Sequence, residues 1–473
     1  MNAHPESPAA NPAASLARRN AALFVAFRIL FNVRFYYPVF MVMFLDFGVT
    51  LEQFGILNAV WAAAIVLLEV PSGALADLVG RRRLLVASAG LMVVEMLLLC
   101  LVPVPSRWVF PALLLNRIVS GAAEALASGA DEALAYDSLQ AAGRSAEWPK
   151  VLETLMQAGA IVTIATMVAG SLLYDPRPLN MLAVSVGLPP TLTAADTFRL
   201  PVWLTLGSAL AAVAATLAMR EPPREKASAD IGLLAPFRET IATGSWILAH
   251  PLVLAVIMAG VLCDQPIRQL LVVSSEIYRE IAIPEPAFGL VGALSASVSL
   301  MAAGPIRRLA IQASPRRNFV VLVAITLAGL VGTALFVPVL GVAFAILLSL
   351  TMRMVVFLQS HYLNQLVGSD RRATVLSFRG LAVNVGYGLM SLGFAAAAAG
   401  MEAAGVTTTE ATDRMPAFRA AVALLPVSFV VLCGLFLGWV SRAVRDRSLL
   451  AHDGGFEIAS QHAATPPPAV PPP

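Results

Sequence analysis

The sequence is poor in charged residues and in cysteine. Only 13% of its 473 residues are charged and 58% are hydrophobic, whereas soluble domains average about 25% charged and about 45–50% apolar residues. A soluble chain of this length needs far more surface charge, so the composition excludes a water-soluble globular protein. The three cysteines, Cys100, Cys263 and Cys433, lie inside apolar runs without paired spacing, which favours buried thiols over disulfides or metal ligands.

Motifs of several enzyme classes are also absent. The sequence contains no Gly-x-x-x-x-Gly-Lys-Ser/Thr loop, no His-Glu-x-x-His, no Cys-x-x-Cys and no Gly-x-Ser-x-Gly. The first of these patterns cradles phosphates in ATPases, so we do not expect ATP-driven transport by this chain. We expect no enzyme activity, no cofactor and no metal site.

Long apolar runs are what the chain has instead. A membrane-spanning helix needs about 20 mostly apolar residues, and continuous rather than alternating runs favour helices over a β-barrel. Six such segments precede a charged interval and six follow it. They fall near 21–45, 51–76, 83–103, 108–130, 151–173, 201–219, 247–272, 287–311, 318–337, 339–367, 373–399 and 416–441. We predict an all-α polytopic membrane protein whose twelve transmembrane helices form two pseudo-symmetric six-helix bundles.

The charged interval and the two ends complete the predicted organisation. A tail (1–20) precedes the first bundle (21–219), a linker (220–246) joins it to the second (247–442), and a Pro-rich tail (443–473) is predicted to be disordered. The first apolar run is too long for a cleaved signal peptide. Of the 32 Lys and Arg residues, 20 fall on one side of the predicted membrane, 6 on the other and 6 within helices. Because cytoplasmic loops carry the positive excess, we expect a multi-pass inner (plasma) membrane protein with both termini in the cytoplasm.

The turn between the second and third segments carries the most specific pattern. It reads Gly73-Ala74-Leu75-Ala76-Asp77-Leu78-Val79-Gly80-Arg81-Arg82-Arg83 and resembles the loop signature Gly-x-x-x-Asp-x-x-Gly-Arg-(Arg/Lys) of the major facilitator superfamily. Arg117 and Gly121 resemble the weaker helix-4 pattern of that family, Arg-x-x-x-Gly, and the run Asp370–Ser377 resembles its entry into helix 11. The resemblance spans residues 21 to 442 and implies a secondary transporter.

The same turn is the candidate for a conformational latch. Gly73 lets a neighbouring helix approach closely, and Gly80 permits a tight turn. Asp77 can accept hydrogen bonds from the arginines that follow it, or from exposed amides at a helix N-terminus. The family resemblance implies a cytoplasmic latch of Asp77, Arg81 and Asp137, the last being the acidic residue that ends helix 4. The alternatives are an ordinary basic loop and a solvated helix end.

Charged residues in the fourth segment form a second candidate site. Steps of seven place Arg117, Glu124 and Asp131 within about 40° of one another around a helix. A charge at membrane depth costs about 2.5–3.5 kcal/mol, so we expect this stripe to face a cavity or partner charges. The alternative is a structural ion pair that locks helices together.

The first segment carries two arginines that differ in depth. Arg28 is shallow enough to extend its charge to the interface. Arg34 is deeper, so we expect it to face the cavity or to pair with an acid of the fourth segment. Further acidic candidates lie at Glu69 and Glu95.

The second half contributes two further candidate groups. Asp264 and Arg268 are four residues apart and can pair within one helix, and the glutamines and proline around them are typical of a kinked stretch that lines a cavity. Arg353 and His361 are eight apart and share one helix face. An unperturbed histidine titrates near pH 6.5, which makes His361 a candidate proton carrier. A structural histidine is the alternative.

Together these features predict a secondary transporter that moves a small solute by alternating access. Burial disfavours the charged form of a carboxyl group, so Glu124, Asp131 and Asp264 favour coupling to protons. No dense Asn/Gln/His set marks a sugar site, which favours efflux of amphiphilic compounds. The Gly-Pro-x-x-Gly-Gly marker of the family's drug antiporters is nevertheless absent, because Thr166–Leu172 stands in its place.

Two alternatives to that function remain. One is proton-linked solute uptake, and the other is a non-transporting membrane receptor or scaffold. As partners we expect a small-molecule solute, the lipid bilayer and protons. We expect a monomer and no binding to nucleic acid.

Overall fold

The computed structural model describes residues 12–222, 235–368, 371–404 and 415–450. All regular structure within these ranges is helical, which confirms the predicted all-α fold. Eleven of the described helical segments are long and apolar enough to cross a membrane. The one predicted segment that is not among these eleven, 287–311, is interrupted at Ala302 and consists of two shorter helices.

The N-terminal group of helices contains the first six predicted segments. Thr50 starts α3 with a capping box, and Gly80, at φ +102°, ends α3 and begins α4. Gly129, at φ +75°, divides the fourth segment into α5 and α6. The elements are α1 (Pro12–Asn32), η1 (Tyr37–Val39), α2 (Phe40–Asp46), α3 (Leu51–Val79), α4 (Arg81–Leu101), α5 (Val109–Ala127), α6 (Ala130–Ala141), η2 (Ser145–Glu147), α7 (Trp148–Tyr174), α8 (Pro176–Ser185), α9 (Ala194–Thr197) and α10 (Leu200–Ala218).

The C-terminal group begins with a helix inside the interval predicted as a linker. This helix ends at Ala249, because Pro251 disfavours a helical conformation for the residue before it and begins the next helix. The elements are α11 (Ala235–Ala249), α12 (Pro251–Val272), α13 (Ser274–Glu280), η3 (Glu285–Ala287), α14 (Phe288–Met301), α15 (Ala303–Gln312), α16 (Pro315–Ala334), α17 (Leu340–Leu366), α18 (Arg372–Ala403) and α19 (Met415–Leu450).

Both predicted tails contain helix in their described parts. The first helix begins at Pro12, inside the predicted tail 1–20, and the last continues to Leu450, inside the predicted disordered tail 443–473. The residues 1–11 and 451–473 lie outside the described ranges.

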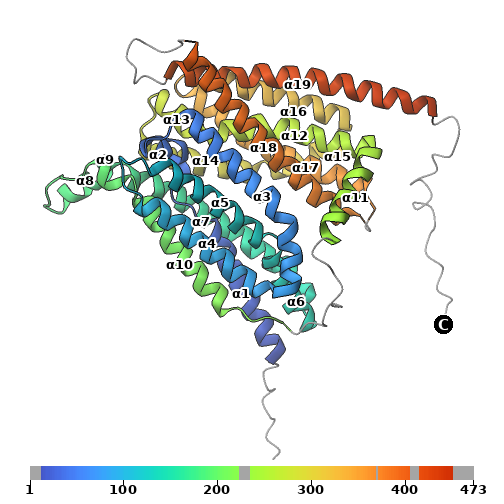
Figure 1. Ribbon diagram of the computed structural model, residues 1–473, viewed down its shortest axis with the longest axis horizontal. Coiled ribbons are helices and arrows are strands. Elements are labelled where there is room, and N and C mark those ends of the chain that lie inside the picture. Colours follow the sequence, from blue (N-terminus) through green and yellow to red (C-terminus); the bar gives the residue numbers. More distant parts are fainter. Residues whose placement is uncertain (1–11, 223–234, 369–370, 405–414, 451–473) are drawn as a thin grey trace, which may run out of the picture.

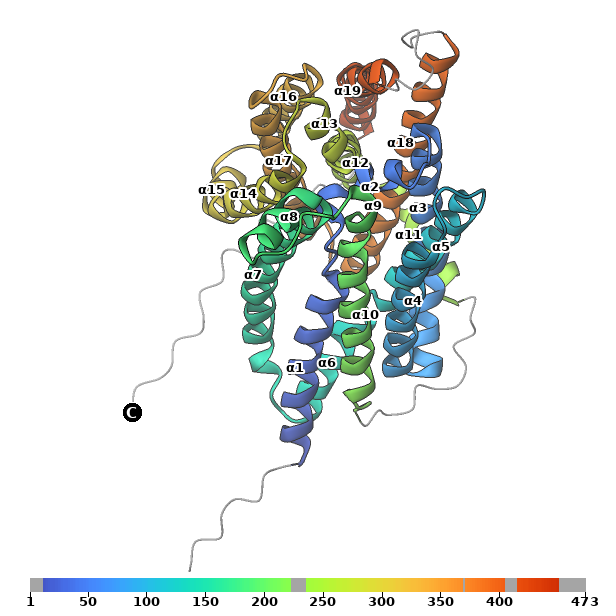
Figure 2. The same cartoon turned by 90° about the vertical axis from the view of Figure 1, so that its left-hand side faces the viewer.

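The two groups of helices form a V (Figure 1). They converge where α2 meets α13 and diverge toward the far ends of α1 and α6, where α11 of the C-terminal group still contacts α3. Figure 2 shows the same convergence from the side, with α2 beside α12 and α13. Across the groups, α3 packs on α18 and α7 packs on α14. We call the α2–α13 end the closed end, and the opposite end, which carries the Gly80 turn and α11, the basic end.

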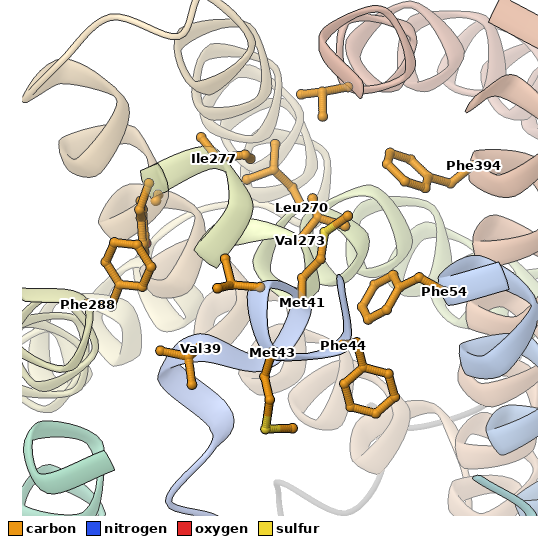
Figure 3. Close-up of a cluster of buried hydrophobic side chains, with 14 of the residues drawn as sticks. Val39, Met41, Met43, Phe44, Phe54, Leu270, Val273, Ile277, Phe288 and Phe394 are labelled. Atoms are coloured by element: carbon orange, nitrogen blue, oxygen red, sulfur yellow. The ribbon is translucent and has the colours of Figure 1, made fainter. Parts of the chain in front are cut away.

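A cluster of apolar side chains fills the closed end (Figure 3). The N-terminal group contributes fully buried side chains such as Phe44 and Phe54, and the C-terminal group contributes Leu270, Ile277 and Phe288. Each buried aromatic ring removes about 150–250 Å² from water, at roughly 25 cal/mol per Å² of apolar surface. The cluster therefore seals this end and holds the two groups together there.

Candidate functional site

Polar contacts supplement the apolar seal at the closed end. Arg279 of α13 donates from Nη2 to Asp46 Oδ2 of α2 at 3.0 Å, and from the same nitrogen to Glu285 Oε1 at 2.8 Å. The backbone N–H of Met41 donates to Ser275 Oγ at 3.1 Å. Each of these contacts to Asp46 and Met41 joins the N-terminal group to the C-terminal group.

Two glycines allow the helices to meet without side chains between them. A Cβ on Gly55 of α3 would stand 2.7 Å from the carbonyl oxygen of Ser391 in α18. A Cβ on Gly289 of α14 would stand 2.1 Å from the carbonyl oxygen of Met167 in α7. These distances are far below van der Waals contact, so the closed end requires glycine at both positions.

The packing of α7 changes along its length. Its cross-group contacts lie near the closed end, where Met167 faces Gly289 and Gly292. Nearer the basic end, the side chains of Met156 and Ile161 are each 70% exposed. The closed end is therefore where α7 is fixed to the C-terminal group.

A buried charge cluster lies inside the N-terminal group. The chain leaves helical geometry after Asn32, and this irregular stretch places Arg34. Arg34 Nη2 donates to Glu95 Oε2 of α4 at 3.3 Å, and Arg117 Nη2 of α5 lies 3.9 Å from Glu95 Oε1. Arg117 also donates to Asn116 Oδ1 at 2.8 Å. The sequence offered several acids to Arg34, and the structure selects the one on α4 rather than one in the fourth segment.

The charged stripe predicted for the fourth segment is interrupted. The turn at Gly129 separates α5 from α6, so the spacing of seven does not continue from Glu124 to Asp131. Asp131 is fully buried and accepts a hydrogen bond from Arg28 Nη1 at 2.8 Å. Arg28 therefore has a buried partner that the sequence did not indicate, while its own side chain stays 32% exposed.

Glu124 differs from the buried acids Glu95 and Asp131 because its side chain is exposed. It lies within electrostatic reach of Arg28, Arg34 and Glu95, and of Glu69 on α3. An accessible carboxyl group between arginines and a second carboxyl group can gain and lose a proton as its surroundings change.

A small pocket opens beside this cluster between α1 and α7. It is a narrow recess that is partly open to solvent. The side chains around it are mostly hydrogen-bonding groups. They are Asn32, Arg34, Tyr37, Thr163 and Thr166, with Val33 and Met167 as the apolar members. The two threonines were missed in the sequence, although their i, i+3 spacing places them on one face of a helix.

The second half holds a second buried ion pair. Arg268 binds Asp264 in a bidentate manner, with Nε–Oδ2 at 2.8 Å and Nη2–Oδ1 at 2.9 Å. This is the pair that the four-residue spacing permits. The neighbouring Gln265 donates to the carbonyl oxygen of Val383 at 3.1 Å, so the polar stretch of α12 packs on α18.

The other two candidates of the second half lie apart from this pair. Arg353 is exposed on α17 and makes no ion pair with any side chain in the described ranges. His361 lies 3.2 Å from Gln365 Nε2 and stacks on Phe357. The structure therefore does not join Arg353 and His361 to Asp264 and Arg268 in one cluster.

At the basic end, the Gly80 turn contacts its own group of helices. Arg81 forms an ion pair with Asp137 of α6. The backbone N–H groups of Arg81 and Arg82 donate to the two carboxylate oxygens of Glu221 at 3.0 and 2.9 Å. A carboxylate is stabilised at a helix N-terminus by these free N–H groups and by the helix dipole.

The sequence did not predict the role of Glu221. Two of the predicted latch residues, Asp77 and Gly73, form no described contact at this turn. The side chain of Asp77 lies outside the described part of the chain. No atom lies within 4 Å of a Cβ built on Gly73. The predicted close helix approach at Gly73 is therefore not made in this form, in which the α3 surface there faces open space.

Helix α11 lies across α3 and α18 at the basic end. Phe378 of α18 packs on Gly244, and the guanidinium of Arg371 lies 5.2 Å from the centroid of the Trp246 ring. The run predicted as the entry into helix 11 begins at Asp370, which lies outside the described ranges.

Comparisons with known proteins identify relatives of this architecture. A sequence profile described as the Major Facilitator Superfamily matches residues 22–390. No curated protein matches the chain. Among solved structures, a mutant of the nucleoside transporter NupG superposes with a TM-score of 0.66 at 14% identity, covering 89% of this chain and 99% of that one.

Two further structures are similar. A bacterial homolog of the human lysosomal transporter Spinster, described as inward-facing and unoccupied, gives a TM-score of 0.68 at 14% identity, with 92% of this chain and 98% of that one covered. A D-xylose-proton symporter gives 0.58 at 10% identity, with 89% and 96% covered. At these identities the likeness shows the fold.

Proposed function

This chain belongs to the major facilitator superfamily, and we propose that it is a proton-coupled transporter that exports small amphiphilic solutes by alternating access. It is a secondary transporter rather than an enzyme. The observation that carries the proposal is the difference between its two ends. The closed end is sealed by side chains from both groups of helices, whereas the groups diverge toward the basic end.

This difference is what alternating access requires. Transporters built from two related bundles expose a central site by rocking one bundle against the other. In the present form, the contacts that join the groups at the closed end can be exchanged for contacts at the basic end. The apolar cluster and the Asp46–Arg279 pair are then the parts of the closed end that must separate.

The orientation is part of the proposal. The excess of Lys and Arg at the basic end favours the cytoplasm on that side. The present form then opens to the cytoplasm, in agreement with the similarity to a structure described as inward-facing. Solutes from the cytoplasm or the inner leaflet can reach the charge cluster from this side, which supports export.

We assign the proton coupling to Glu124. Its carboxyl group is exposed, and Arg28 and Arg34 lie within electrostatic reach. Closure of the basic end would remove it from water, which disfavours its charged form and promotes protonation. Proton-linked uptake uses the same geometry in the opposite direction and is the second candidate.

Transport by purified full-length protein in liposomes tests the proposal. We would measure fluxes of ethidium, benzoate, uridine and xylose with and without an imposed pH gradient. We expect the wild type to move at least one of these solutes faster with the gradient. Glu124→Gln should reduce the gradient-driven flux at least tenfold while preserving solute exchange at equal pH.

A control variant is available on the same bundle. Glu153 is exposed on α7 and bonds only to Gln157 among the described residues, so Glu153→Gln should transport like the wild type. If no solute moves, or if Glu124→Gln retains full coupling, the proposal fails. A receptor or scaffold role then becomes the better account.

A further inference from the structure

We propose that the pocket between α1 and α7 binds the carboxylate group of the transported solute, with Arg34 as its cationic anchor. The inference rests on the proposed transport function and names the chemical class of its solute. It depends on three features of the pocket, which are a free guanidinium nitrogen, an excess of buried positive charge and a wall of neutral donors.

The first feature is the unfinished bonding of Arg34. Its side chain is only 6% exposed, yet Nη1 has no hydrogen-bond partner among the described atoms. Its single ion pair, through Nη2 to Glu95, is long at 3.3 Å. A buried donor without a partner is destabilising by about 1–3 kcal/mol, more when charged. Such a group in the wall of a pocket is suited to a ligand.

The second feature is the charge balance of the buried cluster. Arg34 and Arg117 share one buried carboxylate, that of Glu95. The cluster therefore holds two positive charges and one negative charge. Removing the partner of a buried charge is strongly destabilising, so a ligand with a single negative charge is the species that best completes this cluster.

The third feature is the remainder of the pocket wall. Tyr37, Thr163, Thr166 and Asn32 line the same space as Arg34. Hydroxyl and amide groups can donate to a carboxylate without adding charge. Arginine binds planar carboxylates through two parallel N–H groups. The pocket is narrow and partly open to solvent, so only the carboxylate group of a solute would enter it.

The pocket also explains how a proton and a carboxylate can bind together. Glu124 lies within electrostatic reach of Arg34. When Glu124 is ionised, it supplies the missing negative charge at a distance. When it is protonated, the excess positive charge remains for the solute. Protonation should therefore strengthen carboxylate binding. For a carboxylate solute, this coupling favours the second candidate, proton-linked uptake, over export.

Ligand binding to purified full-length protein in detergent tests this inference. We would compare benzoate with benzamide, lactate with lactamide and succinate with succinamide at constant ionic strength, and include inorganic phosphate. The readout is the shift in thermal unfolding temperature, which reports binding to the folded state. We expect at least one carboxylate to stabilise the wild type at concentrations at which its amide does not.

Variants distinguish carboxylate binding in the pocket from nonspecific effects of anions on stability. Arg34→Gln should abolish the difference between acid and amide. Thr166→Val keeps the charge cluster intact and should weaken carboxylate binding five- to tenfold. Thr154→Val is the matched control, because Thr154 lies on the same helix outside the pocket and bonds only to the Lys150 carbonyl among the described residues. It should bind like the wild type.

Several results would overturn the inference. These are equal stabilisation by acids and amides, stabilisation by phosphate alone, persistence of the effect in Arg34→Gln, and unchanged affinity in Thr166→Val. If Arg34→Gln does not fold, Thr166→Val against Thr154→Val decides. Because the assay needs neither a membrane nor a gradient, carboxylate binding without flux would reject the transport function alone. Gradient-driven flux without carboxylate binding would reject the pocket assignment alone.

Discussion

The closed end and the basic end of this protein use different chemistry to hold helices together. At the closed end, buried apolar side chains and the Asp46–Arg279 pair come from both groups of helices. At the basic end, the ion pair of Arg81 with Asp137 and the Glu221 cap stay within the N-terminal group and its first linker residues. The closed end is thus a joint between the two groups, whereas the described contacts of the Gly80 turn organise only one of them.

The difference shows where a change can alter the balance between conformations. A substitution at the closed end removes contacts that exist only while the two groups touch, so it favours opening there. A substitution at the Gly80 turn removes contacts that the structure contains within one group. Opening of the closed end should therefore be insensitive to a substitution at the Gly80 turn.

The largest effect is expected where backbones meet across the groups. Gly289→Ala places a methyl group 2.1 Å from the Met167 carbonyl oxygen. Overpacking of this kind costs about 1–3 kcal/mol, which corresponds to about a 5- to 150-fold shift toward opening of the closed end. The rate of maleimide labelling at Met43→Cys, a fully buried position of the apolar cluster, should rise accordingly.

A matched control lies one turn away on the same helix. A Cβ on Gly292 would stand 3.4 Å from Met167 Sδ, which is close to ordinary contact. Gly292→Ala should leave the labelling rate within about threefold of the wild type. Equal rates for the two variants would contradict the role given to the Gly289 approach.

The next effect is a pH dependence of the closed end. Burial raises the pKa of Glu276 from 4.5 to about 7, opposed by Arg279 and supported by Asp46, Glu280 and Glu285. Closure takes up a proton, because a solvated Glu276 in the open form would titrate near its ordinary value. Closure is thus most favourable below about pH 4.5, and this advantage is lost as the pH rises through about 7.

The measurement is the labelling rate of Met43→Cys as a function of pH, divided by the rate for a free thiol at the same pH. This ratio should rise with pH by up to tenfold per unit across that window. Glu276→Gln cannot titrate and should flatten the profile at the low rate. A profile that is flat in the wild type, or unchanged in Glu276→Gln, would reject this residue as the source.

A smaller effect is expected from the ion pair that joins the groups. Arg279 and Asp46 are 29% and 37% exposed, so solvent limits the contribution of the pair to about 0.2–1 kcal/mol. Arg279→Gln should increase closed-end opening up to about fivefold. Arg419→Gln is its control, because Arg419 pairs with Glu280 inside the C-terminal group. A larger increase in the labelling rate for Arg419→Gln than for Arg279→Gln would contradict the view that ion pairs across the groups, and not those within one group, hold the closed end together.

The smallest effect is expected at the basic end. Asp137→Asn breaks the pair with Arg81, which lies within the N-terminal group. Labelling of Met43→Cys should change by less than about twofold. The predicted role of the Gly80 turn as a latch would appear instead as a slower solute flux in liposomes. A tenfold change in the labelling rate would show that the Arg81–Asp137 pair also controls opening of the closed end.

The sequence was most informative where spacing along the chain determines the outcome. Apolar runs predicted the helices, and the i, i+4 spacing identified the Asp264–Arg268 pair. The cap formed by Glu221 on a helix that begins 140 residues earlier depends on how α10 packs beside α4. Spacing alone could not reveal it.

The choice among partners was also beyond the sequence. Arg34 had several acids in neighbouring segments available, and tertiary packing selects Glu95. The break at Gly129 was missed, although Gly129 followed by Asp131 and Glu132 is a pattern typical of a helix end and a new helix start. The contact of α2 with α13 belongs to one conformation of the protein, and a sequence encodes all its conformations at once.

The central claim is that this transporter, in its present form, opens at the basic end and is sealed at the closed end. Single cysteines at Ser128, exposed between α5 and α6, and at Met43 test it directly, because the native cysteines are buried. A membrane-impermeant maleimide should label Ser128→Cys in inside-out vesicles at least tenfold faster than Met43→Cys in right-side-out vesicles. The reverse order would contradict the claim.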